Sequence, residues 1–112
     1  MMTKQEFRNY LSGGIHFLDG ATGSNLMLLG MPKGCCAEKW ILEHPQPLIA
    51  LQQGYAQAGS DIIYAPTFQA NPIALEKEGL ADKTEEINAR LIALSRQAAP
   101  DCLIAGDLAT LA

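Results

Sequence analysis

The sequence lacks any long apolar run. No stretch approaches the roughly 20 apolar residues that a helix needs to cross a bilayer. The first residues, Met1 to Glu6, also lack the apolar core of a signal peptide. We therefore expect no membrane insertion, and a cytoplasmic location.

Charged residues are few and form no long runs. They make up 18% of the 112 residues, and eight Lys and Arg against twelve Asp and Glu give a formal net charge of −4. A protein that binds nucleic acid or anionic lipid usually carries a basic patch, which this distribution does not supply. The 48% share of apolar residues is typical of a globular domain. We therefore expect neither nucleic-acid nor membrane partners.

Cysteine is scarce and odd in number. The chain has Cys35, Cys36 and Cys102. Cysteines adjacent in sequence form a disulfide only at high strain, and no secretory signal points to an oxidising compartment. We expect three free thiols.

Helical and strand patterns alternate along the chain. A short N-terminal helix over residues 3–12 ends at Gly13-Gly14, so residues 1–14 form an N-terminal helical segment. Apolar runs predict strands over residues 15–18, 61–65 and 102–106. Between them, helical spacing with prolines at the start and glycine at the end predicts helices over 45–59, 72–79 and 82–99, the last beginning at a capping box of Asp82 and Glu85.

This alternation predicts an α/β fold with parallel strands, and it places residues 15–112 in about three βα units. Three parallel strands leave open edges and uncovered faces, whereas a closed (β/α)₈ TIM barrel needs eight units in about 250 residues. We therefore expect an incomplete part of a larger barrel. Open sheet edges are pairing templates, so self-association is expected as well.

Small and polar residues follow each predicted strand, where parallel α/β folds place their sites. Asp19 is suited to hold a substrate ammonium group, and the backbone N–H groups of Gly20 and Ala21 to receive a carboxylate. The alternative for Asp19 is an Asx-type turn. Thr67 follows the second predicted strand, and the alternative to a role in the site is a hydroxyl that caps the local backbone. For Asp107 we favour a helix cap over a catalytic role.

A dinucleotide-binding oxidoreductase is a weaker alternative. Gly20-Ala21-Thr22-Gly23 follows a predicted strand and looks like the start of a dinucleotide fingerprint. The third glycine is missing, because Leu26 occupies its position, and no strand brings an acidic residue to a ribose at the required distance.

A series of sequence blocks resembles the opening part of the homocysteine S-methyltransferase family. The blocks are Leu18 to Leu26, Leu29 to Pro32, Glu38 to Trp40, His44-Pro45, Tyr55 to Ile62 and Ala65 to Asn71. The family includes the homocysteine module of cobalamin-dependent methionine synthase and betaine-homocysteine methyltransferase. The resemblance implies the N-terminal portion of a (β/α)₈ barrel that transfers a methyl group to zinc-bound homocysteine and gives methionine.

Carried over to matching positions, the resemblance implies a homocysteine site. Asp19 would take the amino group, the backbone of Gly20 and Ala21 the carboxylate, and Thr67 would line the pocket, with Asn71 as a weaker assignment. The methyl donor is open: a methylated corrinoid, with a partner corrinoid protein, is one of several donors that such enzymes use.

No catalytic residue and no metal ligand is expected in this chain. The resemblance implies zinc in the complete domain, held by three cysteines on late strands, beyond Ala112. Gly34-Cys35-Cys36 imitates that late motif, but two thiolates from one short loop leave a tetrahedral site short of a protein ligand. We therefore expect a fragment that is inactive alone. The competing hypothesis is a non-catalytic fragment or assembly piece.

Overall fold

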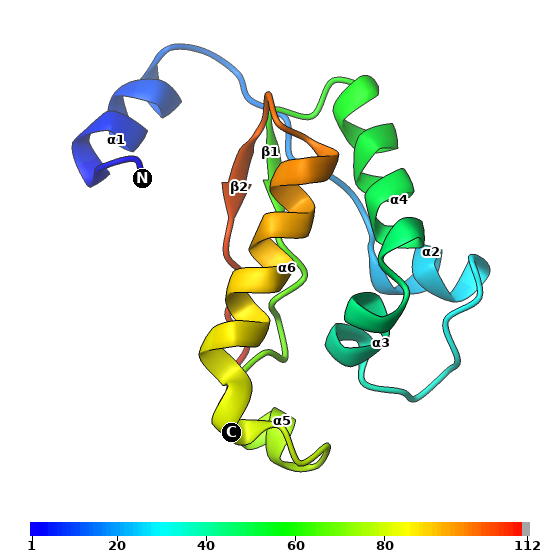
Figure 1. Ribbon diagram of the computed structural model, residues 1–112. Coiled ribbons are helices and arrows are strands. Elements are labelled where there is room, and N and C mark those ends of the chain that lie inside the picture. Colours follow the sequence, from blue (N-terminus) through cyan, green and yellow to red (C-terminus); the bar gives the residue numbers. More distant parts are fainter. Residues whose placement is uncertain (111–112) are drawn as a thin grey trace.

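Two parallel strands form the centre of the computed structural model, which describes residues 1–110. Strand β1 (Ile62–Tyr64) pairs with β2 (Leu103–Ala105), and the register places Ile63 beside Ile104. Both strands lie within the ranges that the apolar runs predict. The parallel pairing requires the chain to cross from one end of the sheet to the other between them, and helices make that crossing (Figure 1).

The segment at 15–18, predicted to be a strand, forms only a single parallel bridge, between Leu18 and Ile62. The Phe17 carbonyl accepts hydrogen bonds from the N–H groups of Asp61 and Ile62, and Asp19 donates to Ile62. This contact puts the segment beside β1, on the side opposite β2. A full strand does not form because within residues 1–110 nothing covers the apolar side chains here: Ile15 is 84% exposed and Phe17 63%.

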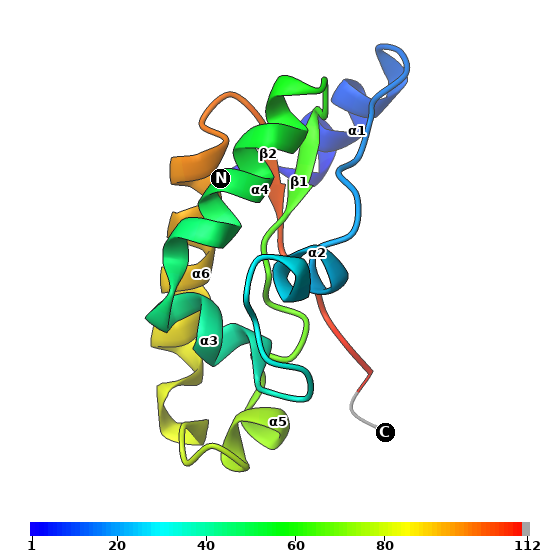
Figure 2. The same cartoon turned by 90° about the vertical axis from the view of Figure 1, so that its right-hand side faces the viewer.

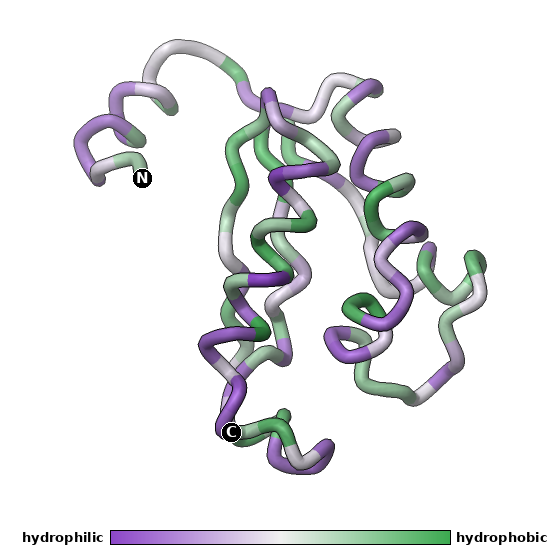
Figure 3. The backbone as a smooth tube through the Cα atoms, viewed as in Figure 1, coloured by the Kyte–Doolittle hydropathy of each residue, from purple (hydrophilic) through white to green (hydrophobic). Residues whose placement is uncertain are grey.

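Helices α4 (Pro45–Gln57) and α6 (Thr84–Ala98) lie against the same face of the strands (Figures 1 and 2). Each packs on a strand and on the other helix. Figure 3 shows hydrophobic residues concentrated on the strands and on the turns facing them. The main hydrophobic cluster lies between the helices and the loops beside them, and consists of Leu26, Met31, Ile41, Leu48, Ala70, Leu75, Ile87 and Leu91. One face of the short sheet is thus covered by helices, as an α/β layer requires.

The prolines predict helix starts correctly. Helix α4 begins at Pro45, and α5 (Pro72–Glu76) begins after Asn71, whose side chain accepts a hydrogen bond from the Ala74 N–H. The predicted capping box at Asp82 is wrong. Residues Ala81–Lys83 form the short 3₁₀ helix η1, and α6 follows without a side-chain cap.

Helix α1 (Lys4–Ser12) stands apart from the strands and helices of the core (Figure 1). Thr3 and Glu6 form a reciprocal capping box at its start, and none of its residues is buried. Local hydrogen bonds therefore define this helix, and it contributes no side chain to the core.

Two short helices lie between residue 18 and Pro45, where the sequence patterns predict no helix. They are α2 (Gly23–Leu28) and α3 (Ala37–Glu43). Neither has a capping side chain, and α2 contains residues of low helix propensity. Tertiary packing of Leu26 and Ile41, both almost fully buried, stabilises them instead. In the part of the chain that the structure describes, no helix is long and apolar enough to cross a membrane.

Candidate functional site

Asp19 lies at the carboxyl-terminal edge of the sheet, where β1 ends. Its Oδ2 accepts a hydrogen bond from the N–H of Tyr64, the last residue of β1, at 3.3 Å. Burial raises the pKa of Asp19 above its ordinary value; the N–H groups of Tyr64 and of Asp19 itself oppose the rise, and the Asp107 carboxylate adds to it. A half-buried carboxylate with so few partners is suited to bind a cation or an ammonium group.

Thr67 connects the two loops that follow the strands. Its buried hydroxyl donates to the Asp107 carbonyl at 3.0 Å and accepts from the Asp107 N–H at 2.9 Å. The structure therefore brings Asp19, Thr67 and Asp107 to the same edge of the sheet. Because both hydrogen bonds of the hydroxyl go to backbone, the role of Thr67 in ligand binding stays a prediction. Asp107 caps no helix within residues 1–110.

Gly20 and Ala21 follow Asp19 on the same side. The Ala21 carbonyl accepts hydrogen bonds from the Tyr55 hydroxyl at 2.7 Å and from the Asn25 amide at 2.9 Å. The backbone N–H groups of Gly20 and Ala21 donate no hydrogen bond to any described residue. Unengaged N–H groups beside a carboxylate form a small site with donors for an anion and an acceptor for an ammonium group.

Asn71 serves as the N-cap of α5. Its Oδ1 accepts from the Ala74 N–H at 2.9 Å, and the residue is half-buried. This hydrogen bond satisfies one of the free donors at the start of the helix. The amide oxygen is thus engaged, and a contact of Asn71 with substrate stays a prediction.

A cleft of about 450 Å³ opens next to this edge. Its walls come from α2, the start of α3, the end of β1 and the residues around α5, and they include Thr22, Leu26, Cys36, Glu38, Tyr64, Phe68 and Asp107. Asp19, Ala21 and Thr67 do not line the cleft, but Asp19 is hydrogen-bonded to Tyr64 and Ala21 precedes Thr22, and both of these residues do. The cleft is large enough for a small amino acid.

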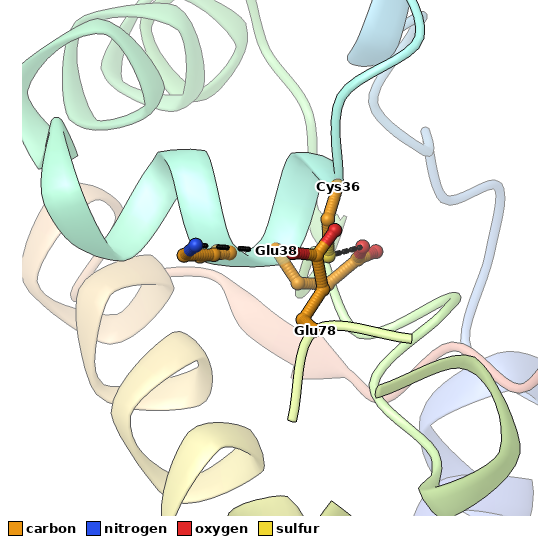
Figure 4. Close-up of polar contacts among 4 residues, drawn as sticks. Cys36, Glu38 and Glu78 are labelled. Atoms are coloured by element: carbon orange, nitrogen blue, oxygen red, sulfur yellow. Dashed lines mark hydrogen bonds and ion pairs between the residues drawn. The ribbon is translucent and has the colours of Figure 1, made fainter. Parts of the chain in front are cut away.

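Glu38 is a buried acidic residue in the cleft wall for which sequence reasoning assigned no role. It is 5% exposed, and its Oε2 accepts from the Gln69 N–H at 3.1 Å while the Cys36 thiol points at its Oε1 at 3.8 Å (Figure 4). Nearby, Lys39 forms an ion pair with Glu78 at 3.8 Å. Glu38 thus ties α3 to the loop after β1. The only sequence signal was its place in a block that resembles the family.

The three cysteines are free thiols and lie in different places. Cys35 is exposed, Cys36 is next to Glu38, and Cys102 donates to the Ser60 carbonyl at the opposite end of the sheet. Burial, more than any other cause, raises the pKa of both Cys36 and Cys102, which favours the thiol over the metal-binding thiolate. Among residues 1–110, no three His, Cys, Asp or Glu side chains are grouped to hold a metal ion. The zinc cysteines that the resemblance implies beyond Ala112 stay a prediction.

Comparisons with known proteins agree with the fold and show a family. The family model described as homocysteine S-methyltransferase matches residues 16–112. Among solved structures, the homocysteine methyltransferase MmuM from Escherichia coli superimposes with a TM-score of 0.80 in its metallated form and 0.78 in its oxidized form, at 22% sequence identity in both cases. The sequence matches none of the curated proteins with which it was compared.

The match extends over most of this chain and a smaller part of the other. It covers 94% of this chain and 41% of the metallated MmuM chain, and 92% and 40% for the oxidized form. A fold that aligns with about two fifths of a larger structure is consistent with part of a barrel. Since the family match takes in all but the first fifteen residues, the chain belongs to the homocysteine S-methyltransferase family.

Proposed function

We propose that this chain supplies the amino-acid-binding part of a homocysteine S-methyltransferase domain. The observation that carries the proposal is the edge after β1, where Asp19 is followed directly along the chain by Gly20 and Ala21, whose N–H groups donate to no described residue. An α-amino acid presents an ammonium group and a carboxylate on one carbon atom. The edge offers the two complementary partners on adjacent residues, beside a cleft that leaves room for the side chain.

In the proposed reaction the complete domain transfers a methyl group to the sulfur of homocysteine and gives methionine. A free thiol has a pKa of about 8.5 and is mostly protonated at neutral pH, so the sulfur must first be converted to a thiolate. Zinc would supply that activation in the complete domain. Our proposal for the described residues is restricted to binding: Asp19 and the neighbouring backbone hold the amino-acid end, which fixes the direction in which the sulfur points.

Calorimetric titration of the 112-residue chain with L-homocysteine under reducing conditions tests this proposal. We expect saturable binding, and weaker binding of two analogues that each lack one recognised group: 3-mercaptopropylamine, without the carboxylate, and 4-mercaptobutyrate, without the amino group. Each analogue leaves one set of partners unused. Absence of saturable homocysteine binding, or equal binding of all three compounds, would contradict the proposal.

A second candidate function, an assembly piece, is favoured by the state of the sheet. In the described residues β2 pairs only with β1, and the segment on the other side of β1 exposes Ile15, Phe17 and Leu18. Unpaired backbone next to exposed apolar side chains is a template for another chain. We propose that the chain associates with itself through the unpaired side of β2 and the exposed segment at residues 15–18.

Sedimentation velocity over a range of concentrations measures this association. We expect species heavier than the 12.0 kDa monomer, with a proportion that rises with concentration. Lysine substitutions at Phe17 and Leu18 place charge on the exposed edge and should shift the distribution toward monomer. A single monomeric species at every concentration would argue against the assembly function and leave the binding proposal intact.

A further inference from the structure

Tyr55 reaches the proposed amino-acid site from helix α4. Its hydroxyl donates to the Ala21 carbonyl at 2.7 Å, across 34 positions of sequence, and accepts from the Asn25 amide at 3.2 Å. Asn25 also donates to the same carbonyl. The three groups form a closed hydrogen-bonded arrangement that attaches the turn after Asp19 to α4.

The ring of Tyr55 lies directly against Gly20. A Cβ atom at position 20 would approach the tyrosine oxygen to 2.8 Å, closer than real Cβ atoms come, and Cε1 to 3.0 Å. The backbone of Gly20 has no positive φ, so it is the close approach of Tyr55, and not an unusual turn conformation, that favours glycine at this position. Gly20 and Tyr55 are therefore a matched pair.

The turn is held at both of its ends. At one end the Asp19 N–H donates to the Ile62 carbonyl at 3.1 Å, and at the other the Ala21 carbonyl is held by Tyr55 and Asn25. The unengaged N–H groups of Gly20 and Ala21 lie between these two anchors. When the backbone that carries the donors is already fixed, less conformational entropy is lost when an anion binds.

We propose that Tyr55 is a positioning residue for the substrate carboxylate, acting by fixing the Gly20 and Ala21 backbone. This inference rests on the proposed function, since it assigns the carboxylate to those N–H groups. The inference goes beyond the proposed function because it assigns part of the affinity to a side chain on α4 that does not contact the ligand. The tyrosine hydroxyl, and not the ring alone, carries the effect.

Tyr55→Phe tests the inference, because it keeps the ring against Gly20 and removes only the hydroxyl. In calorimetric titration we expect L-homocysteine to bind about five- to tenfold more weakly, the order of effect of one hydrogen bond. Binding of 3-mercaptopropylamine, which has no carboxylate, should be unchanged. A tyrosine that only supports the fold would not distinguish the two ligands.

Tyr10→Phe is the matched control. Its hydroxyl makes no hydrogen bond to a described residue, and α1 lies outside the core, so we expect wild-type binding of both ligands. Should Tyr55→Phe fail to fold, Asn25→Ala removes the other donor to the Ala21 carbonyl and is expected to weaken homocysteine binding with the same selectivity.

Three results separate the failure of this inference from the failure of the proposed function. Unchanged homocysteine affinity in Tyr55→Phe, together with weakened affinity in Asp19→Asn, would overturn the inference and preserve the function. Equal weakening for both ligands in Tyr55→Phe would also overturn it. If the wild-type chain does not bind homocysteine at all, the proposed function fails and the inference fails with it.

Discussion

Asp19→Asn is expected to weaken L-homocysteine binding about ten- to a hundredfold, the largest effect on binding among the substitutions described. The asparagine keeps an oxygen for the Tyr64 N–H, so the local geometry is preserved, but the negative charge that would pair with the substrate ammonium is lost. Hydrogen bonds to charged groups are worth more than neutral ones, which sets this range. Calorimetric titration measures it.

The same substitution should not reduce the stability of the fold at neutral pH. Burial raises the pKa of Asp19, so the folded chain holds this proton more tightly than the unfolded chain does. The stabilisation from the protonated form is present below the ordinary aspartate pKa and is lost as the pH rises through the raised value of the folded state. Asparagine is neutral at every pH, so the variant does not lose this stabilisation as the pH rises.

Urea unfolding of wild type and Asp19→Asn at mildly acidic and neutral pH checks the direction in which stability changes with pH. We expect the two chains to converge at acidic pH and the variant to be equal or more stable at neutral pH. Asp101→Asn, at an exposed turn before β2, is the control and should alter neither binding nor stability. A variant that loses binding only because it unfolds would contradict the binding role of Asp19.

Leu91→Ala is expected to lower the free energy of unfolding by about 3 kcal/mol, within the range for buried leucines. Leu91 is fully buried on α6, in the core cluster that also contains Leu48 of α4 and Leu75 of α5. Truncation leaves a cavity between the helices that cover β1 and β2. Small domains are stable by only about 5–15 kcal/mol, so a loss of this size is a large share of the total.

Urea denaturation followed by circular dichroism measures the effect. Leu108→Ala makes the same chemical change at a residue that is 93% exposed, and should change stability by less than about 0.5 kcal/mol. A loss below about 1 kcal/mol in Leu91→Ala would mean that α4, α5 and α6 do not form one cooperative core.

Elements with strong local signals were predictable from sequence. Helices α4 and α5 begin at the predicted prolines, and β1 and β2 lie within the predicted apolar runs. These signals are local because proline fixes φ and lacks an N–H, which makes the first turn its best place in a helix. The parallel arrangement followed from the alternation of strands and helices.

Other elements depend on contacts that no local pattern contains. Residues 15–18 have the composition of a strand, but a strand requires paired neighbours, and within residues 1–110 only the side toward β1 provides one. Helix α2 contains residues of low helix propensity, and neither α2 nor α3 has a capping side chain; burial of Leu26 and Ile41 stabilises them. The capping box at Asp82 was wrong because η1 occupies that stretch.

By itself, the sequence determined that Asp19, Gly20 and Thr67 follow strand segments, and parallel strands carry their carboxyl ends to a common edge. Only the tertiary structure decided how that edge is held. The bonds of Tyr55 to Ala21 and of Glu38 to Gln69 join residues 34 and 31 positions apart. Such pairs become neighbours only when the helices pack on the sheet and on one another, because no local pattern brings residues so far apart in sequence into contact.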